Sequence, residues 1–139
     1  MTPILENAPL LPLSTTAPVV VRTDPVKGRG LYAARDIGAD EVIEVAPVAI
    51  IDSRQAGLLE ETPLGHHYFH WSGEESDEAS WRGAIAFGLV SLVNHAENAN
   101  AGVWPEHERQ QIVLAAMRPI AEGDEITIHY DVELWFEAR

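Results

Sequence analysis

The sequence predicts a mainly β domain, on two observations. Short runs of β-branched and apolar residues recur along the chain, and turn-forming residues separate them about every 8–12 residues. Stretches of helical length are few. With 139 residues and 46% hydrophobic content, the chain is long and apolar enough to fold as one domain with a buried core.

The expected strands follow from this pattern in chain order. They cover residues 19–21, 31–34, 41–51, 81–85, 110–117 and 125–130. Pro47 has no N–H for a sheet ladder, so we expect it to interrupt the 41–51 stretch, which then forms one or two strands. A short helix is expected at 53–60, with Asp52 or Ser53 as its N-cap.

The two ends and one insert differ in composition from the rest. Residues 1–17 are rich in proline and contain a Ser-Thr-Thr run, so we expect an irregular tail that Pro18 closes. The domain itself is expected at 18–139, and its last residues, 131–139, form a short aromatic tail. Residues 72–80 are acidic and polar, which indicates an exposed insert.

The stretch at 86–102 organises the rest of the chain. An apolar run stops abruptly at Asn94 and His95, and a small polar loop follows; the run contains Phe87, Leu89, Val90, Leu92 and Val93. We expect the run to be buried, and residues 86–93 have the length of a short helix. Asn94 and His95 then lie at the edge of the core, where an amide and an imidazole need partners. They either tie the backbone together or hold a ligand.

Two further stretches are expected to converge on this one. Residues 27–30 (KGRG) belong to a loop at 23–30, where the two glycines permit a positive φ or a close approach of the backbone. Residues 122–130 form a turn and then an alternating strand that ends at Tyr130. Alone, Gly-x-Gly indicates a turn more often than a ligand loop. It is neither a Walker A loop nor a complete dinucleotide fingerprint.

The charge and the absence of cysteine disfavour several classes. A net charge of −13, from 22 acidic and 9 basic residues, disfavours direct nucleic-acid binding and favours cationic partners. No apolar run approaches the ~18–20 residues of a membrane span. The first residues lack the basic start of a signal peptide, so we expect a cytoplasmic protein without a membrane partner. Without cysteine there are no disulfides, thiolate zinc sites or cysteine nucleophiles.

A histidine-rich segment at 66–71 raises the question of a metal site. His66 and His70 have the i, i+4 spacing of a helical zinc pair, and His67 lies between them. No glutamate stands inside the pair and no third ligand follows at a fixed offset, which disfavours a histidine-based metallohydrolase. The aromatic neighbours instead favour a half-buried strand or loop, and we expect no metal.

Three motifs occur along the chain in an order that is typical of one protein family. KGRGLYA at 27–33 is followed by LVNHAENANA at 92–101 and then by IAEGDEITIHY at 120–130. This combination resembles the SET-domain protein lysine methyltransferases, which have a Gly-x-Gly motif, an Asn-His loop and a Gly-Glu-Glu-Leu/Ile-Thr-x-x-Tyr segment. The resemblance extends over residues 18–136, and it is strongest to the minimal, single-domain members of viruses and bacteria.

Some positions depart from the family pattern. Ala96 replaces the usual serine, Ala99 replaces the usual proline, and Leu134 lies near the place of a second active-site tyrosine. The last departure leaves open how many methyl groups are added. The zinc-binding cysteines of larger members are absent, as they are in the minimal members.

The resemblance implies the SET-domain fold, a β-clip-like arrangement of small curved sheets with little helix and a C-terminal pseudoknot. The 94–100 loop and the Tyr130 segment would form this crossing, a rare exception to unthreaded topology. It also implies a protein-lysine N-methyltransferase that uses S-adenosylmethionine. The lysine amine, with an ordinary pKa of about 10.4, must be neutral to accept the methyl group. An apolar channel and the sulfonium charge of the cofactor favour that neutral form.

The site residues are implied by the resemblance alone. Tyr130 would be catalytic, its hydroxyl orienting the amine and the methyl group. The cofactor's methionine part would lie against Gly28 and Gly30, with its carboxylate near Lys27 or Arg29. The adenosine contacts would come from Asn94, His95 and Trp135, and the substrate channel from Tyr68, Tyr130 and Leu134. Trp135 could equally be a packing residue that docks the tail.

The implied substrate is a lysine in a basic protein, such as a histone-like, ribosomal or chromosomal protein, bound as an added strand along a sheet edge. The acidic surface would raise the encounter rate with such a partner. A catalytically idle SET-like module that binds a basic peptide or partner protein is the alternative. A homodimer is also compatible, since some minimal members are dimers.

Overall fold

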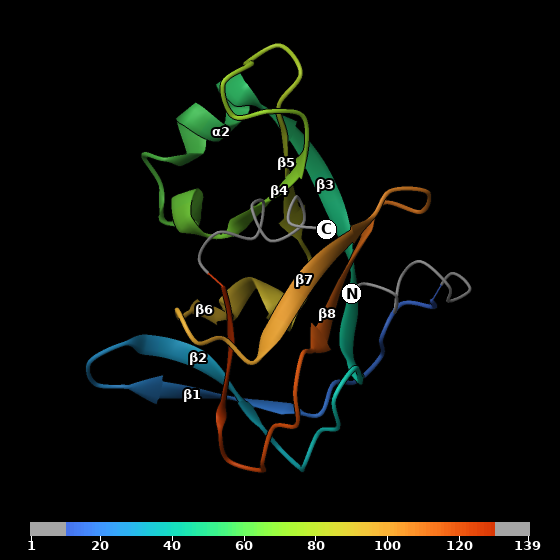
Figure 1. The fold of residues 1–139 in the computed structure, drawn as a ribbon. Helices are drawn as coiled ribbons and strands as arrows, with labels where there is room; N and C mark the ends of the chain where they lie inside the picture. Colours follow the sequence, from blue (N-terminus) through green and yellow to red (C-terminus); the bar gives the residue numbers. More distant parts are fainter. Residues whose placement is uncertain (1–10, 130–139) are drawn as a thin grey trace.

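The computed structural model describes residues 11–129, without the side chain of His66, and the fold is mainly β, as predicted (Figure 1). Within these residues the strands follow the order β1-β2-β9-β7-β8-β3-β5-β4, and β6 pairs with β9 off this path. The strands are β1 (Val19–Asp24), β2 (Gly28–Ala33), β3 (Val42–Asp52), β4 (Tyr68–Ser72), β5 (Arg82–Ala86), β6 (Asn94–His95), β7 (Ala101–Glu106), β8 (Gln111–Ala116) and β9 (Glu125–Ile128). The helical segments are short: α2 (Ser53–Leu59) and the 3-10 turns η1 (Pro63–His66) and η2 (Leu89–Leu92).

The β1–β2 hairpin is longer than the sequence predicted. The two strands pair as far as Asp24 opposite Gly28. The Asp24 carboxylate then closes the turn by accepting the backbone N–H groups of Val26 at 2.7 Å and Lys27 at 3.0 Å. The expected loop at 23–30 is therefore wrong in extent, because the side chain of Asp24 allows the chain to reverse within a few residues.

β3 is one continuous strand, so the predicted interruption at Pro47 is wrong. Its first half pairs with β8, as far as Pro47 opposite Gln111, and its second half pairs with β5 from Val48 onward. Pro47 thus stands where β3 changes its partner. The missing N–H costs little at this point, and the Pro47 carbonyl still accepts the Phe87 N–H at 2.9 Å.

The elements α2, β4 and β5 form a lobe at the top of Figure 1. The predicted helix is present in this lobe, and Asp52 is its N-cap. The Asp52 carboxylate accepts the Gln55 N–H at 2.8 Å, while the side-chain oxygen of Gln55 accepts the Asp52 N–H at 3.0 Å. This capping box satisfies two backbone donors at the start of the helix. The loop at 73–80 is exposed, as expected of the acidic insert.

The core packs against the strands that carry the sequence motifs. Most of the large, fully buried side chains come from β2, β7, β8 and β9, among them Leu31, Val103, Ile112, Leu114, Ile126 and Ile128. Leu31 and Ile126 lie opposite each other in the β2–β9 ladder. A slip of one residue would turn both of these side chains away from the core, so core packing fixes the register of the two motif strands.

The apolar run at 87–93 is buried only in part, which corrects the prediction. Val90 and Val93 are buried, but Phe87 is 64% exposed and Leu89 is 36% exposed. The segment contains the single 3-10 turn η2 and not the expected short helix. Because 3-10 geometry repeats every three residues, Val90 and Val93 share the inward face and Leu89 does not.

The strand β7 was not predicted from the sequence, because Gly102 and Pro105 are residues that weaken a central strand. β7 nevertheless pairs with β8 from Ala101 opposite Ala116 onward, and Ala101 also pairs with β9. Gly102 leaves room for a neighbouring indole, since the Cη2 atom of Trp104 lies 3.1 Å from where a Cβ would stand. Packing of a large side chain over a small one thus outweighs strand propensity here.

The described part of the predicted tail, residues 11–17, contains no strand or helix but is joined to β3. Ser14 donates its N–H to the Val45 carbonyl at 3.0 Å, and its hydroxyl accepts the Val45 N–H at 2.8 Å. Residues 1–10 and 130–139 lie outside the described residues, so the domain boundaries stay predictions. None of the helices between residues 11 and 129 has the length and apolar character that crossing a bilayer requires.

Candidate active site

The three motif segments meet at one place, as expected. β2 pairs antiparallel with β9, with Tyr32 opposite Glu125, and β6 pairs parallel with β9, with Asn94 opposite Thr127 and His95 opposite Ile128. Figure 1 shows β6 and β2 beside the thin red segment that contains β9. Segments from the first, the last and the middle part of the described chain therefore share a single junction.

The side-chain amide of Asn94 ties this junction together. Its Nδ2 donates to the Arg29 carbonyl at 3.0 Å and to Oε2 of Glu125 at 2.8 Å. These bonds fill the first of the two roles that the sequence left open for Asn94, which is to join backbone segments. Both amide protons are used in this way.

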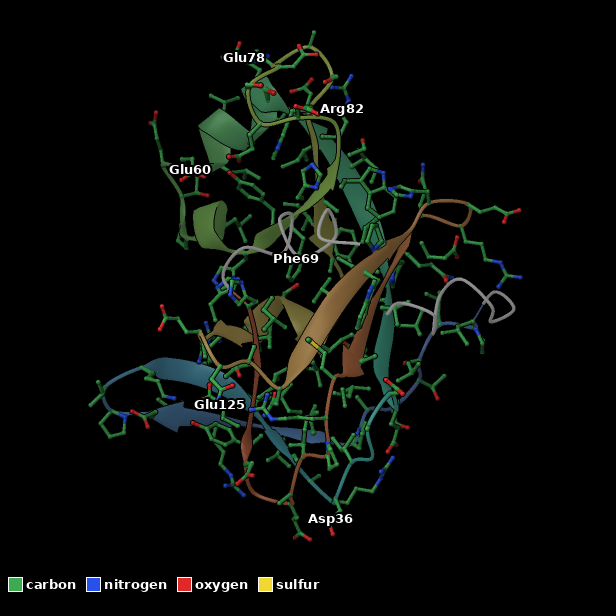
Figure 2. All side chains as sticks on the ribbon, viewed as in Figure 1. Asp36, Glu60, Phe69, Glu78, Arg82 and Glu125 are labelled. Carbon is green, nitrogen blue, oxygen red and sulfur yellow. The ribbon has the colours of Figure 1, made fainter. Side chains whose placement is uncertain are left out.

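Lys27 forms an ion pair with the same carboxylate, through Oε1 of Glu125. The Glu125 side chain is only 10% exposed, whereas that of Lys27 is 54% exposed. The hydrogen bond to Glu125, and then its negative charge, raise the pKa of Lys27. Figure 2 shows Glu125 where β2 meets β9, well below the lobe that contains Glu60 and Glu78.

The two glycines of the Gly-x-Gly motif serve two different purposes. Gly28 has a φ of +83°, and nothing lies within 4 Å of where its Cβ would stand. At Gly30 a Cβ would lie 2.6 Å from Oε2 of Glu125 and 2.8 Å from Nδ2 of Asn94. The sequence named both reasons for glycine, a positive φ and a close approach, and the structure assigns one reason to each residue.

The loop after His95 is held by backbone groups and one amide. Asn100 donates from Nδ2 to the Glu125 carbonyl at 2.8 Å, and its Oδ1 accepts the Thr127 N–H at 3.0 Å. The Ala96 N–H donates to the Ile128 carbonyl at 2.9 Å. Sequence reasoning noted Asn100 as part of the motif but gave it no role, and its two bonds to β9 show that the role is to fasten the loop.

Arg118 holds the tip of the same loop and was missed by sequence reasoning. Its guanidinium donates to the Ala99 carbonyl at 2.5 Å and to the Asn98 carbonyl at 3.1 Å. Because these bonds use backbone carbonyls, alanine at 99 does not remove them. The two departures from the family pattern, Ala96 and Ala99, are therefore compatible with a closed loop.

His95 is exposed, yet enough protein surrounds its imidazole that desolvation lowers its pKa. The neighbouring His129 has a smaller effect of the same sign. Since the ordinary pKa of histidine is about 6.5, His95 is neutral at neutral pH. A neutral imidazole has one donor and one acceptor for a ligand or for the backbone.

Tyr68 lies in the α2–β4–β5 lobe. Its hydroxyl donates to the Glu60 carboxylate at 2.5 Å, and its ring packs edge-on against Trp81, with 5.9 Å between the centroids. Burial, and then the hydrogen bond and charge of Glu60, raise the pKa of Tyr68 to about 12. The lobe connects to the motif region through His67, whose Nδ1 lies 2.8 Å from the Ser91 carbonyl.

The remaining predicted site residues lie outside the described residues. These are Tyr130, Leu134 and Trp135, so their assigned roles stay predictions. The chain does reach the junction at Ile128, which pairs with His95 two positions before Tyr130.

The histidine-rich segment bonds to the backbone. The Nε2 atom of His70 lies 2.7 Å from the Gly73 carbonyl, and His67 contacts the Ser91 carbonyl as described above. Among the side chains that the structure describes, which do not include that of His66, no three of the histidine, aspartate or glutamate type gather closely enough to hold a metal ion. β4, at 68–72, is a half-buried aromatic strand, so of the strand or loop expected there the strand is what forms.

Comparison with known proteins agrees with the motifs. A family model for the SET domain matches residues 28–131. A histone-lysine N-methyltransferase of Schizosaccharomyces pombe, H3 lysine-37 specific, is 29% identical over 124 residues, or 87% of this chain and 78% of the relative. An H3 lysine-36-specific histone-lysine N-methyltransferase of Candida albicans is 31% identical over 121 residues. That match covers 82% of this chain but only 14% of the relative, so this chain spans a small part of the larger protein.

Solved structures show the same fold. The Neurospora SET domain protein DIM-5, a histone lysine methyltransferase, superposes with a TM-score of 0.63 at 18% identity, over 83% of this chain and 52% of that one. CpSET8 from Cryptosporidium gives a TM-score of 0.62 at 21% identity, over 82% of this chain and 57% of that one. With the family model, the three motifs and their junction in agreement, the chain belongs to the SET-domain family.

Proposed function

We propose that the protein is an S-adenosylmethionine-dependent lysine methyltransferase that acts on a basic protein. The observation that carries this proposal is the junction where Asn94 and Glu125 lie against Gly30 and Lys27 pairs with Glu125. It joins the three family motifs through side chains as well as through backbone. The relatives named above are histone-lysine N-methyltransferases, which supports lysine as the acceptor.

The residues present fit the proposed cofactor. An ammonium group has three donors, so Lys27 retains donors for a carboxylate besides the one given to Glu125. The space around Gly28 is open. Lys27 or Arg29 would hold the methionine carboxylate, and Asn94, His95 and Trp135 would hold the adenosine. When bound, S-adenosylmethionine supplies an electron-poor methyl group on a positively charged sulfur.

The chain's own task is to present a neutral amine in line with that methyl group. Tyr130 would orient the amine through its hydroxyl, and Tyr68 and Leu134 would line the channel. An apolar channel favours the neutral amine because burial disfavours the charged form. Positioning of the two reacting groups then contributes a large part of the rate enhancement.

The substrate is proposed to be a basic protein segment such as a histone tail. The support is electrostatic: the chain carries a net charge of −13, and opposite charges steer encounter. The cytoplasmic location, the homodimer and the lack of direct nucleic-acid binding stay predictions from the sequence.

Calorimetry with S-adenosylmethionine, followed by methyl transfer to a basic histone-tail peptide, tests the proposal. We expect binding at micromolar concentration and transfer to a lysine. Tyr130→Phe should abolish transfer while the melting temperature and cofactor affinity stay at wild-type values. Binding of the peptide without any binding of S-adenosylmethionine would instead favour the idle peptide-binding module.

A further inference from the structure

Glu125 is a nearly buried carboxylate whose two oxygens have different partners. Oε1 pairs with the Lys27 ammonium, and Oε2 accepts from the Asn94 amide at 2.8 Å. Only 10% of the side chain is exposed. A carboxylate in this position is costly unless it is paired, so the pairings are required by its burial.

The backbone of Glu125 is fixed as firmly as its side chain. Its carbonyl accepts from Nδ2 of Asn100 at 2.8 Å, and its position in the ladder is opposite Tyr32. The carboxylate therefore projects from a fixed point. It reaches across the place of the missing Gly30 side chain, with Oε2 2.6 Å from where the Cβ would stand.

A lysine side chain that is half exposed has many rotamers, and ordering it on binding a ligand costs conformational entropy. The ion pair with Glu125 restricts Lys27 before any ligand arrives. The ammonium still has two donors left for a ligand. A restricted cation with free donors beside an open glycine is suited to receive a small carboxylate.

We propose that Glu125 is the positioning residue of the cofactor site. It holds the Lys27 ammonium where the carboxylate of S-adenosylmethionine binds, and it fixes the Asn94 amide beside it. Glu125 acts through these two residues and touches neither the methyl group nor the substrate amine. This inference rests on the function proposed above.

A second ion pair in the chain supplies a matched control. Arg35 Nη2 lies 2.7 Å from Oε2 of Glu41, and the Glu41 carboxylate also accepts the Gly38 N–H at 2.9 Å. Glu41 precedes β3 and belongs to none of the three motifs. Glu41→Gln therefore removes one carboxylate charge and one ion pair without altering the junction.

Calorimetry of Glu125→Gln with S-adenosylmethionine is the central experiment. We expect the dissociation constant to rise about tenfold, as for loss of a charge-assisted contact, while Glu41→Gln keeps the wild-type value. On a histone-tail peptide, the KM for the cofactor should rise and kcat should stay near wild type. A role of Glu125 in stability alone would lower the melting temperature of Glu125→Gln but leave its dissociation constant at the wild-type value, which overturns the inference.

Lys27→Met separates action through Lys27 from other effects. A glutamine side chain keeps one oxygen for the Asn94 amide, so Glu125→Gln removes chiefly the ion pair with Lys27. The double variant Lys27→Met/Glu125→Gln should therefore bind S-adenosylmethionine no more than about twofold more weakly than Lys27→Met alone. Fully additive losses would show that the two residues act independently and would overturn the inference.

Lys27 is the only lysine in the sequence, which gives a readout that does not depend on activity. Isotope-labelled lysine yields one Cε signal in an NMR spectrum. In wild-type protein that signal should shift when S-adenosylmethionine is added, and the pKa of Lys27 should fall in Glu125→Gln. No shift at saturating cofactor overturns the inference even where Glu125→Gln fails to fold. If wild-type protein binds no S-adenosylmethionine at all, the proposed function fails as well.

Discussion

The carboxylate of Glu44 accepts the backbone N–H of Val90 at 2.7 Å, so a residue of β3 caps a turn 46 positions later in the chain. Its second oxygen accepts the Leu89 N–H at 3.1 Å. Gly88, the N-cap residue of η2, has no side chain to do this, and a Cβ there would lie 3.0 Å from Oε1 of Glu44. η2 ends two residues before Asn94, so Glu44 determines how the chain enters the junction.

Glu44→Gln should therefore destabilise the fold. The amide that replaces one oxygen would place N–H groups against the backbone N–H groups of η2, and Glu44 is only 9% exposed. The expected loss is about 1–3 kcal/mol of unfolding free energy, measured by urea denaturation. Glu106→Gln is the control, because the Glu106 carboxylate also accepts a backbone N–H, that of Arg109 at 2.9 Å, but in an exposed turn. Equal stability of the two variants would contradict the assigned role of Glu44.

Gly30→Ala should weaken both the fold and cofactor binding. The added methyl group would lie 2.6 Å from Oε2 of Glu125 and 2.8 Å from Nδ2 of Asn94, so their hydrogen bond must break or the strands must separate. We expect the free energy of unfolding, measured by urea denaturation, to fall by about 2–4 kcal/mol. We also expect that calorimetry no longer detects binding of S-adenosylmethionine.

Gly28→Ala is the natural comparison for Gly30→Ala. Its Cβ meets no atom within 4 Å, and only its φ of +83° is unfavourable for alanine. Gly28→Ala should therefore lower the free energy of unfolding by only about 1 kcal/mol. If the two alanine variants lose the same stability and the same affinity, close packing at Gly30 is not what the motif requires.

Local patterns predicted what depends on neighbours in sequence. Alternation of apolar residues predicted most strands, and the capping residues predicted α2. The two reasons for glycine in Gly-x-Gly were also visible from the sequence, because the absence of a side chain is itself the signal. The family motifs then indicated which segments would meet, and the β2–β9 and β6–β9 ladders confirm it.

Local patterns failed where the partner is distant. Glu125 and Glu44 have partners 98 and 46 residues away, and in a chain with 22 acidic residues nothing local distinguishes a buried carboxylate from an exposed one. The sequence predicted a strand break at Pro47, because a sequence does not show that β3 changes its partner from β8 to β5 at this residue. The sequence also did not predict which residues of the 87–93 run are exposed. That depends on the 3-10 turn η2, and the amino-acid composition of such a turn does not distinguish it from a short helix.

Acidification should destabilise the fold in part through His95. Desolvation and then His129 lower the pKa of His95 in the folded state. As the pH falls through about 6.5, the unfolded chain takes up the proton first, so stability is lost until the pH reaches the lower folded value. His95→Gln should lose less stability than wild-type protein between neutral pH and about 5.5, measured by urea denaturation at each pH. Parallel curves for the two proteins would argue against a lowered pKa.

Alkaline pH should reveal the environment of Tyr68. Burial is the main cause that raises its pKa to about 12, and the hydrogen bond to Glu60 adds to it. The phenol ionises at a pH of about 10 in the unfolded chain but stays protonated up to about 12 in the folded state. The free energy of unfolding therefore falls as the pH rises between these two values. Tyr68→Phe removes this contribution, and the advantage of wild-type protein over Tyr68→Phe should shrink between about pH 10 and 12.

Glu60→Gln shows which cause dominates the raised pKa of Tyr68. Burial of the ring beside Trp81 remains in this variant, so the phenol should still ionise above its ordinary value of about 10, though earlier than in wild-type protein. The ultraviolet difference spectrum between each protein and its Tyr68→Phe counterpart isolates this single phenol. A full return to the ordinary pKa would mean that the Glu60 charge, and not burial, controls Tyr68. A phenol that desolvation keeps neutral is a hydrogen-bond donor that an apolar lysine channel can contain. A pKa that stays raised in Glu60→Gln would therefore support the proposed place of Tyr68 in the substrate channel.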